Sequence, residues 1–252
     1  MNNEVEKRLA HFMFPVTERE VFFESKDGGI PLRTNNYKAV TRGSDNQLIS
    51  IMKNTYKIIP NREVIMPLLE QLDKLDTTWL IDNSHSFVDI SRMRLQVTFP
   101  ELVLNDGRSD IALSLFLHNS YDGSEGVRMY WGAIRGICSN GMVFGEVLSQ
   151  FYGRHTSGIN LSDLKEKVEA TYEKIPVIKH RIELLQNLKV TSDLRNDVTK
   201  KLGKGVTNFI EQQEKAKNQW MLYNILTYYI SHAVKQRMRA HYQFEVSKLF
   251  NL

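Results

Sequence analysis

Apolar residues at alternate positions, separated by glycine-containing turns, fill residues 87–147 and constrain the fold more than any other stretch. In the run at residues 87–99, Met93, Leu95 and Val97 are apolar and arginines lie between the apolar positions, which is typical of a strand with one buried face. Further runs follow at residues 111–118 and 127–138. We therefore predict three or four adjacent antiparallel strands here.

Short turn motifs separate these runs. Asn105-Asp-Gly107 and residues 121–126 combine Asp and Gly as tight turns do. Asn140-Gly141 is the strongest two-residue hairpin signal in the chain, because such turns require positive φ. We predict that Gly123 and Gly141 occupy positive-φ positions and that Asn140-Gly141 forms a tight turn.

The segment before this region combines a strand signal with a helix signal. Residues 55–59 are β-branched or aromatic, as in a strand, and Pro60 ends the run. Asn61 is a candidate cap for a helix from Arg62 to about Lys74. Pro67 falls inside that helix, which therefore starts late or kinks there.

After Gly158 the apolar period changes from two towards 3.6, which predicts helices. We expect one at residues 163–174, capped by Asn160 or Ser162, and a second at residues 178–188. Ser192 is expected to cap a third helix, which the turn at residues 203–205 closes. Residues 206–249 form one long helix or two.

These elements predict an α+β fold, with an antiparallel sheet and flanking helices followed by a helical C-terminal region. We place a mixed α+β domain at residues 1–158 and a basic helical region at residues 159–252. With 252 residues, the chain is long enough to bury a full core.

Composition and the single cysteine predict a cytoplasmic protein. Hydrophobic residues make up 42% and charged residues 25% of the chain, as in ordinary soluble proteins. The charged N-terminus has no apolar run behind it, so no signal peptide is expected. The most apolar late segment, residues 220–234, is shorter than the roughly 20 residues of a membrane span. One cysteine allows no internal disulfide.

Positive charge is concentrated in the C-terminal part. Residues 161–252 hold 16 Lys/Arg and 10 Asp/Glu, a net charge of +6, whereas residues 1–160 hold 17 and 19. A basic surface favours a polyanionic partner, because bound phosphates release counterions. Lysine-rich helices also occur for solubility alone, so this pattern leaves both interpretations open.

His118-Asn-Ser-Tyr-Asp-Gly-Ser124, then Arg135-Gly-Ile-Cys-Ser-Asn-Gly141, form one motif, and Tyr56-Lys-Ile-Ile-Pro-Asn-Arg-Glu63 forms another. Together they resemble the centre of a family carried by phages, prophages and plasmids and catalogued as domain of unknown function 932. The resemblance covers roughly residues 40–190 and does not extend to the C-terminal helices. It implies a mobile-element setting and no particular reaction.

Candidate catalytic groups form no recognised constellation. Cys138 could act as a nucleophile with His118 or His155 as its base, but a lone cysteine on an apolar strand is usually a small core residue. Four acidic residues could bind Mg²⁺ or Ca²⁺, although aspartate also favours turns for its own hydrogen bonds; these are Asp106, Asp110, Asp122 and Glu125. Residues 203–207 lack the spacing of a phosphate-binding loop. We expect no metal and no cofactor.

Arginine and aromatic residues on the predicted sheet favour single-stranded nucleic acid, since aromatic rings stack on bases and guanidinium groups bind phosphates. Arg92 and Arg94 share one strand face, and Arg128 and Tyr130 share a face of a neighbouring strand. A solvated face is the alternative. The candidate nucleic-acid-binding residues are Arg92, Arg94, Arg128, Tyr130, Arg135, Lys200, Lys201 and Lys204, and further basic helical residues are Lys215, Lys217, Lys235, Arg237 and Arg239.

The leading interpretation is a non-enzymatic DNA-binding protein of a phage or plasmid, acting in replication, recombination or single-strand annealing. Changing Arg92 and Arg94 together to alanine is expected to weaken binding with little loss of folding. The alternative is a counter-defence or regulatory factor that engages a host protein through the aromatic helix with Trp220, Tyr223, Tyr228 and Tyr229. A third possibility is a hydrolase or nuclease built on the hairpin aspartates. We also expect the helix at residues 220–234 to be buried in the core or in a homo-oligomer interface.

Overall fold

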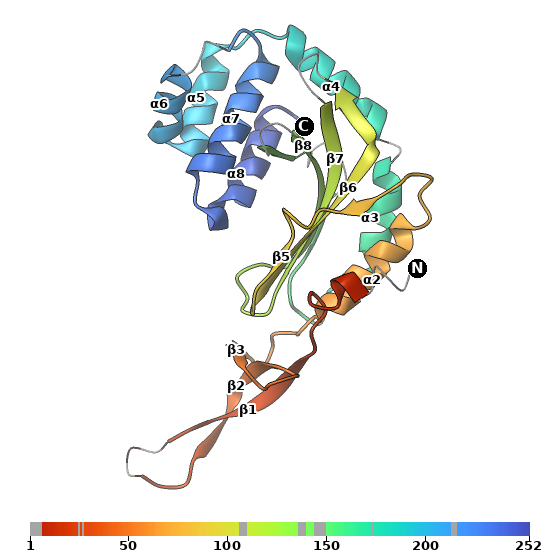
Figure 1. Ribbon diagram of the computed structural model, residues 1–252. Helices are drawn as coiled ribbons and strands as arrows, with labels where there is room; N and C mark the ends of the chain where they lie inside the picture. The colour runs from red at the N-terminus through yellow and green to blue at the C-terminus, as the bar shows by residue number, and fades with distance from the viewer. Residues whose placement is uncertain are drawn as a thin grey trace.

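A computed structural model describes residues 7–24, 26, 28–105, 110–135, 140–143, 150–172, 174–212 and 216–252. Antiparallel strands precede a series of helices, so the chain has the predicted α+β fold (Figure 1). The strands are β1 (Val16–Phe23), β2 (Leu32–Arg42), β3 (Leu48–Lys53), β4 (Leu80–Ile81), β5 (Phe87–Val88), β6 (Arg92–Asn105), β7 (Asp110–Ser120), β8 (Val127–Arg135), β9 (Asn140–Val143) and β10 (Gln150–Gly153). The helices are α2 (Asn61–Leu72), α3 (Ser162–Tyr172), α4 (Ile175–Asn187), α5 (Ser192–Leu202), α6 (Lys204–Gln212), α7 (Gln219–Ala233) and α8 (Gln236–Leu249).

The main sheet has seven antiparallel strands with β7 at its centre. Its order is β10-β8-β7-β6-β4, with β9 also paired to β8 and β5 also paired to β6. This arrangement confirms the predicted adjacent antiparallel strands between residues 87 and 147, within the part of that stretch that the structure describes.

Alternate residues of the central strands face opposite sides of the main sheet. On one side, Leu95 of β6 pairs with Leu117 of β7, which pairs with Met129 of β8, and all three are buried. We call this side the core face, and the other side the polar face. Along the polar face, Arg94 pairs with His118, which pairs with Arg128.

Helices α2, α3 and α4 follow one another along one side of the main sheet (Figure 1). The Phe99 and Trp131 rings stack in the core, with centroids 5.0 Å apart. Both rings are fully buried, and they belong to a connected apolar core that also includes Leu68 of α2 and Leu226 of α7. Removal of this apolar surface from water is the main stabilising contribution to the fold.

A three-stranded sheet, β1-β2-β3, projects from the body of the molecule, and we call it the arm (Figure 1). This sheet was not expected from the sequence. Its charged residues lie so densely between the apolar ones that no alternating pattern stands out. The arm joins the body where Ser50 Oγ donates a hydrogen bond to the Tyr121 carbonyl oxygen at 2.6 Å.

Two turn predictions have different outcomes. Gly123 has a φ of 72°, which confirms the predicted positive-φ position. The prediction for Asn140-Gly141 is wrong, because both residues lie in β9, where Asn140 pairs with Arg135 and Gly141 with Ile134. Strands β8 and β9 pair antiparallel from Arg135 and Asn140 onward, and residues 136–139 lie outside the described part of the chain.

The segment before α2 also differs from its prediction. Residues 55–59 form no strand, because the Lys57 amide donates to the His155 carbonyl oxygen and the Ile59 carbonyl oxygen accepts from the Asn119 side chain. Asn61 does not cap α2, since its side chain is bonded to Phe12 and Asn119. Helix α2 begins at Asn61, well before Pro67, so of the two alternatives, a late start or a kink at Pro67, the late start is wrong.

The C-terminal helices are more numerous than predicted. Three helices, α6, α7 and α8, replace the expected one or two. Pro176 lies in the first turn of α4, where its missing N–H group costs little. Thr191 rather than Ser192 caps α5, and its hydroxyl accepts from the Leu194 amide at 3.2 Å. Gly203 closes α5 with a φ of 83°, as predicted.

Helix α7 is buried mainly in the chain's own core. Trp220, Tyr223 and Leu226 are each at most 2% exposed, whereas Tyr228 is 43% exposed. Burial of this helix is therefore confirmed, and two of the four aromatic residues expected to contact a host protein are inaccessible to one. The predicted domain boundary at residue 158 falls between β10 and α3, and the division into two domains stays a prediction. No helix in the described ranges is long and apolar enough to span a bilayer.

Candidate nucleic-acid interface

A hollow of about 380 Å³ lies where the polar face of the main sheet meets α8. We call it the sheet–helix hollow. Three lining residues come from the sheet and four from the last helix, so segments far apart in the sequence form one site. The lining residues are Arg128, Gln150, Tyr152, His241, Phe244, Glu245 and Lys248.

Arg128 lies between two aromatic rings in this hollow. Its guanidinium carbon is 5.2 Å from the Tyr152 ring centroid and 5.2 Å from the Phe244 ring centroid. Tyr152 stands beside Arg128 because β10 pairs with β8 in a register that places them opposite each other. Both distances fall within the range of cation–π attraction, so the rings orient the guanidinium. Tyr152 remains 54% exposed, so a ligand in the hollow can reach its side chain.

Lysines and one glutamate set the charge of the hollow. Glu245 accepts from Lys201 of α5 at 2.6 Å and lies 3.5 Å from the Lys248 ammonium group. The hydrogen bond from Lys201, reinforced by the charges of both lysines, lowers the pKa of Glu245. The hollow is thus lined by two cations, Arg128 and Lys248, and one carboxylate, Glu245, and Lys201 adds a third cation beside its lining. The surplus of positive charge favours an anionic ligand.

A buried polar network lies behind the hollow on the same face of the sheet. Arg94 Nη2 donates to Glu125 Oε1 at 2.5 Å, and His118 Nδ1 is 3.2 Å from Glu125 Oε2. His118 Nε2 lies 3.2 Å from the Tyr130 hydroxyl. The Tyr130 ring in turn packs edge-on against Phe244. The network therefore supports the ring on which Arg128 rests.

Burial and charge fix the protonation of this network. Burial lowers the pKa of His118, and this effect exceeds the opposing influence of Glu125. Burial alone would raise the pKa of Glu125, but the hydrogen bond from His118 and the nearby charges lower it to about 2. Burial raises the pKa of Tyr130. A neutral His118 thus donates from Nδ1 to an ionised Glu125 and accepts at Nε2 from the Tyr130 hydroxyl.

The sheet residues predicted to bind nucleic acid differ in accessibility. Arg128 lines the hollow, and Arg92 is half-exposed at the end of β6, where it pairs with Asp89 at 3.2 Å. The Arg94 side chain is only 14% exposed and is held by Glu125. Tyr130 is 3% exposed, so its ring packs on Phe116 and Phe244 instead of presenting a free face. The Arg135 side chain lies outside the described part of the structure.

The predicted helical lysines do not form one cluster. Lys201 pairs with Glu245, which lines the hollow, whereas Lys200 pairs with Asp197 on its own helix. Lys204 is exposed at the start of α6. Among the other basic residues, Arg239 Nε donates to the Val234 carbonyl oxygen at 2.9 Å. Lys215 and the side chain of Arg237 are outside the described residues.

The acidic and nucleophilic candidates serve local structure where they are described. Asp122 accepts from the Ser124 amide within its own turn, Asp110 accepts from Asn105, and Glu125 is bound by Arg94 and His118. Within the described ranges, no three His, Cys, Asp or Glu side chains converge to hold a metal ion. Asp106 and Cys138 lie outside those ranges.

The two sequence motifs meet at the junction of the arm, α2 and the main sheet. Asn119 Nδ2 donates to Asn61 Oδ1 and to the Ile59 carbonyl oxygen, each at 2.8 Å. The Tyr121 hydroxyl accepts from the Asn61 amide at 2.7 Å. Tyr56 donates to the Ser120 carbonyl oxygen at 2.9 Å. These buried bonds hold the segments together, so the motif residues named here have an architectural role.

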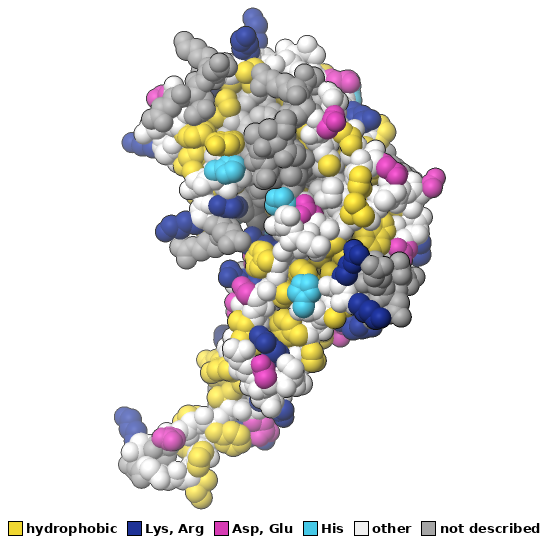
Figure 2. Space-filling view, viewed as in Figure 1, with side chains coloured by type: hydrophobic (Ala, Val, Ile, Leu, Met, Phe, Trp, Pro, Cys, Tyr) yellow, Lys and Arg dark blue, Asp and Glu magenta, His cyan; other side chains and the backbone are white. Residues whose placement is uncertain are grey.

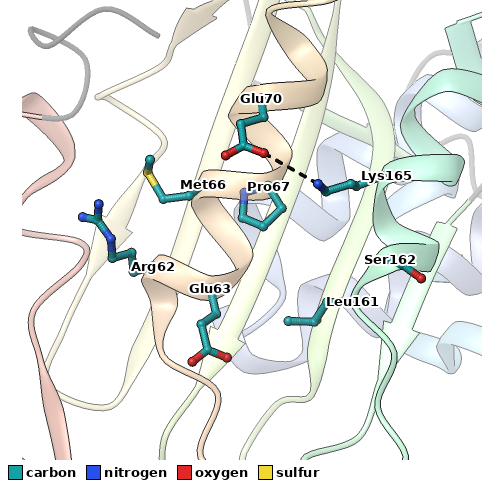
Figure 3. Close-up of a pocket in the computed structure, with 8 residues that line it drawn as sticks. All are labelled: Arg62, Glu63, Met66, Pro67, Glu70, Leu161, Ser162 and Lys165. Carbon is teal, nitrogen blue, oxygen red and sulfur yellow. Dashed lines mark ion pairs between the residues drawn. The ribbon is translucent and has the colours of Figure 1, made fainter.

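A larger groove of about 610 Å³ runs between α2 and α3 (Figure 3). Its charged lining residues are equal in number and opposite in sign: Arg62 and Lys165 are matched by Glu63 and Glu70, and Lys165 lies 3.6 Å from Glu70. Because the opposite charges balance, this groove does not favour a polyanion. The smaller sheet–helix hollow is therefore the better candidate for a nucleic-acid interface.

Several residues of the hollow were not predicted from the sequence. Phe244, His241 and Lys248 are on α8, and their distance along the chain from Arg128 gives no local sign that they meet it. Tyr152 belongs to the four-residue strand β10, which lies beyond the strands predicted at residues 87–147. The signal available in the sequence was a tyrosine, Tyr152, shortly after the predicted strands.

The fold and site define an α+β protein with an antiparallel sheet whose polar face meets a basic helical region. The profile of the family described as "Domain of unknown function (DUF932)" matches residues 48–249, so the chain belongs to this family. The match confirms the resemblance and extends it through α8, whereas β1 and β2 precede it.

The curated proteins and the solved structures give no match to the chain.

Proposed function

We propose that this protein binds single-stranded DNA at the sheet–helix hollow without catalysing a reaction. The observation that carries the proposal is the exposed Tyr152 ring beside Arg128 in a hollow with surplus positive charge. Proteins that bind single strands combine a basic groove with aromatic rings on which bases stack. Tyr152 would stack on a base, while Arg128 and Lys248 would contact the phosphates on either side.

The geometry favours a single strand over a duplex. The bases of a duplex are stacked on one another and cannot offer a face to Tyr152, whereas an unpaired base can. Arg128 is held between two rings at the wall of the hollow rather than on a helix that would enter a major groove. Recognition is thus expected to depend little on base sequence.

The biological setting follows from the family resemblance. Phages and plasmids carry genes for proteins that coat or anneal single strands during replication and recombination. The proposed role is therefore in replication, recombination or single-strand annealing of a mobile element.

The first prediction concerns Tyr152 and Lys248. In a fluorescence anisotropy titration with a labelled single-stranded oligonucleotide at low salt, Tyr152→Ala should weaken binding roughly tenfold, because stacking of one base contributes about 1–3 kcal/mol. Lys248→Ala should weaken binding less and should reduce the slope of log affinity against log salt by about one, the loss of one phosphate contact.

Matched variants elsewhere on the surface are the controls. Tyr228→Ala removes a tyrosine of similar exposure from α7, and Lys179→Ala removes an exposed lysine from α4; neither should change the affinity. A duplex of the same sequence should bind more weakly than the single strand. Failure of the wild type to bind either DNA at low salt would refute the function, and equal binding by Tyr152→Ala and wild type would refute the site.

A further inference from the structure

One exposed histidine, His241, lines the sheet–helix hollow. It shares a face of α8 with Phe244, Glu245 and Lys248, because residues three, four and seven positions apart lie on one side of a helix. Its ring lies 5.5 Å from the Tyr242 ring, and within the described residues the structure gives it no ion pair. A positive charge on His241 would therefore be available to a ligand in the hollow.

Histidine differs from the other charged groups of the hollow in its response to pH. It is the side chain whose charge ordinarily changes between about pH 5 and pH 8, whereas lysine and arginine remain charged there. Glu245 remains ionised as well, because the hydrogen bond from Lys201 and the charges of Lys201 and Lys248 lower its pKa. Acidification within this range thus changes the charge of the hollow at His241.

A second histidine, His118, lies behind the hollow on the polar face of the sheet, but its surroundings oppose protonation. Burial lowers its pKa, the charges of Arg94 and Arg128 act in the same direction, and Glu125 acts in the opposite one. The His118 side chain is also almost fully enclosed, with Tyr130 at its Nε2 atom. A bound phosphate can therefore reach the ring of His241 but not that of His118.

We propose that His241 takes up a proton when single-stranded DNA binds in the hollow, so that the affinity for DNA rises as the pH falls. The inference rests on the proposed function, because the group that favours the proton is a DNA phosphate. A phosphate beside the ring stabilises its protonated form. By thermodynamic linkage, the protonated protein must then bind the phosphate more tightly, and by the same factor.

The expected size of the effect follows from one additional cation in the hollow. Each phosphate contact on a single strand contributes about 0.7 to the slope of log affinity against log salt. At roughly 50 mM salt, one such contact corresponds to a gain in affinity of about five- to tenfold. Between about pH 7.5 and about pH 5.5, the affinity of the wild type should rise by this factor, and the salt dependence should become steeper by about 0.7.

Fluorescence anisotropy with labelled oligo(dT) at these two pH values tests the proposal on the full chain, because thymine does not titrate in this range. His241→Gln should lose the gain in affinity at the lower pH. His241→Lys carries a permanent charge, so it should bind at the higher pH about as tightly as the wild type does at the lower one. Calorimetry in two buffers of different ionisation enthalpy should show proton uptake on binding by the wild type and none by either variant.

The control removes an exposed histidine from another part of the surface. Histidine side chains, coloured cyan in Figure 2, reach the surface at several places, and that of His180 on α4 is 72% exposed. His180 does not line the hollow, so His180→Gln should retain the full gain in affinity at the lower pH. Circular dichroism at both pH values identifies any variant that fails to fold.

The outcomes separate this inference from the function on which it rests. A gain in affinity that persists in His241→Gln would overturn the inference, because the proton would then bind another group, such as His118. A wild type that needs Tyr152 for binding but shows no change with pH would also overturn it and would leave the proposed function standing. No binding of oligo(dT) at either pH would refute both.

Discussion

Arg94 and Arg128 flank His118 on the polar face of the main sheet, yet they have different roles. Arg94 is enclosed and bonded to Glu125, whereas Arg128 lies between two rings at the wall of the hollow. The sequence predicts their common face, because alternate residues of a strand point the same way. It does not reveal the partners that distinguish them, since Glu125 and Phe244 come from other segments.

Replacement of Arg94 should therefore affect folding, contrary to the expectation from the sequence alone. Arg94→Ala leaves the Glu125 carboxylate without its closest cation and should lower the free energy of unfolding by about 1–3 kcal/mol. Arg92→Ala, which removes the more exposed pair with Asp89, should change it by less than about 1 kcal/mol. Urea unfolding of the two single variants measures both values, and equal losses would contradict this distinction.

His118 should make stability depend on pH. Its pKa in the folded protein is below the usual 6.5, since burial and the charges of Arg94 and Arg128 outweigh Glu125. The unfolded chain therefore binds more protons in this range, so the stabilisation is present above pH 6.5 and is lost as the pH falls towards the folded pKa. Glu125 makes stability depend on pH in a lower range, because its pKa is lowered from 4.5 to about 2 in the folded protein and its contribution is lost as the pH falls through that range.

His118→Gln separates this contribution from that of His155, whose pKa is also lowered by burial. Urea unfolding at about pH 7.5 and at about pH 5.5 gives the stability that each protein loses between these pH values, and this loss should be smaller for the variant than for the wild type. The variant retains the His155 contribution, so some loss should persist. If the variant and the wild type lose the same unfolding free energy between the two pH values, His118 does not titrate in this way.

Strands β6, β7 and β8 were predictable because each has a fully buried face that imposes a two-residue period on the sequence. The arm lacks such a face. In β1, six of eight residues are exposed and the other two are half-buried, so its sequence carries no strong alternation. An alternating apolar pattern arises from a buried strand face and not from strand geometry itself, so the exposed strands of the arm were not predicted.

Helix α5 offers a test of how well a capping residue is assigned from sequence. Thr191→Ala removes the hydroxyl that accepts from the Leu194 amide and should lower the free energy of unfolding by about 1 kcal/mol. Ser192→Ala, at the neighbouring position first expected to be the cap, should change it by only about 0.5 kcal/mol or less. Thermal melting of both variants measures the difference, and the reverse order would restore Ser192 as the cap.

At the scale of the whole molecule, the candidate site exists only because the last helix returns to the sheet. Local patterns predict β8 and a helical C-terminal region, and composition predicts the positive charge of the latter. Neither predicts that Phe244 reaches Arg128, because contacts between distant segments depend on how all the intervening helices pack. The sequence thus predicts which types of residue form the site, arginine, lysine and aromatic residues, but only some of the particular residues.

The two faces of the main sheet are formed by alternate residues of the same strands. From β6, up to its register shift after Phe99, through β8 and into β10, residues with odd numbers, such as Leu95, Leu117 and Met129, face the core, while even-numbered residues, such as Arg94, His118 and Arg128, face the other way. A slip of one residue in any pairing would exchange the two sets, so the register is strongly fixed. Within that register, the odd positions hold the apolar core, while the even ones carry both the buried network of Arg94 and His118 and the wall of the sheet–helix hollow.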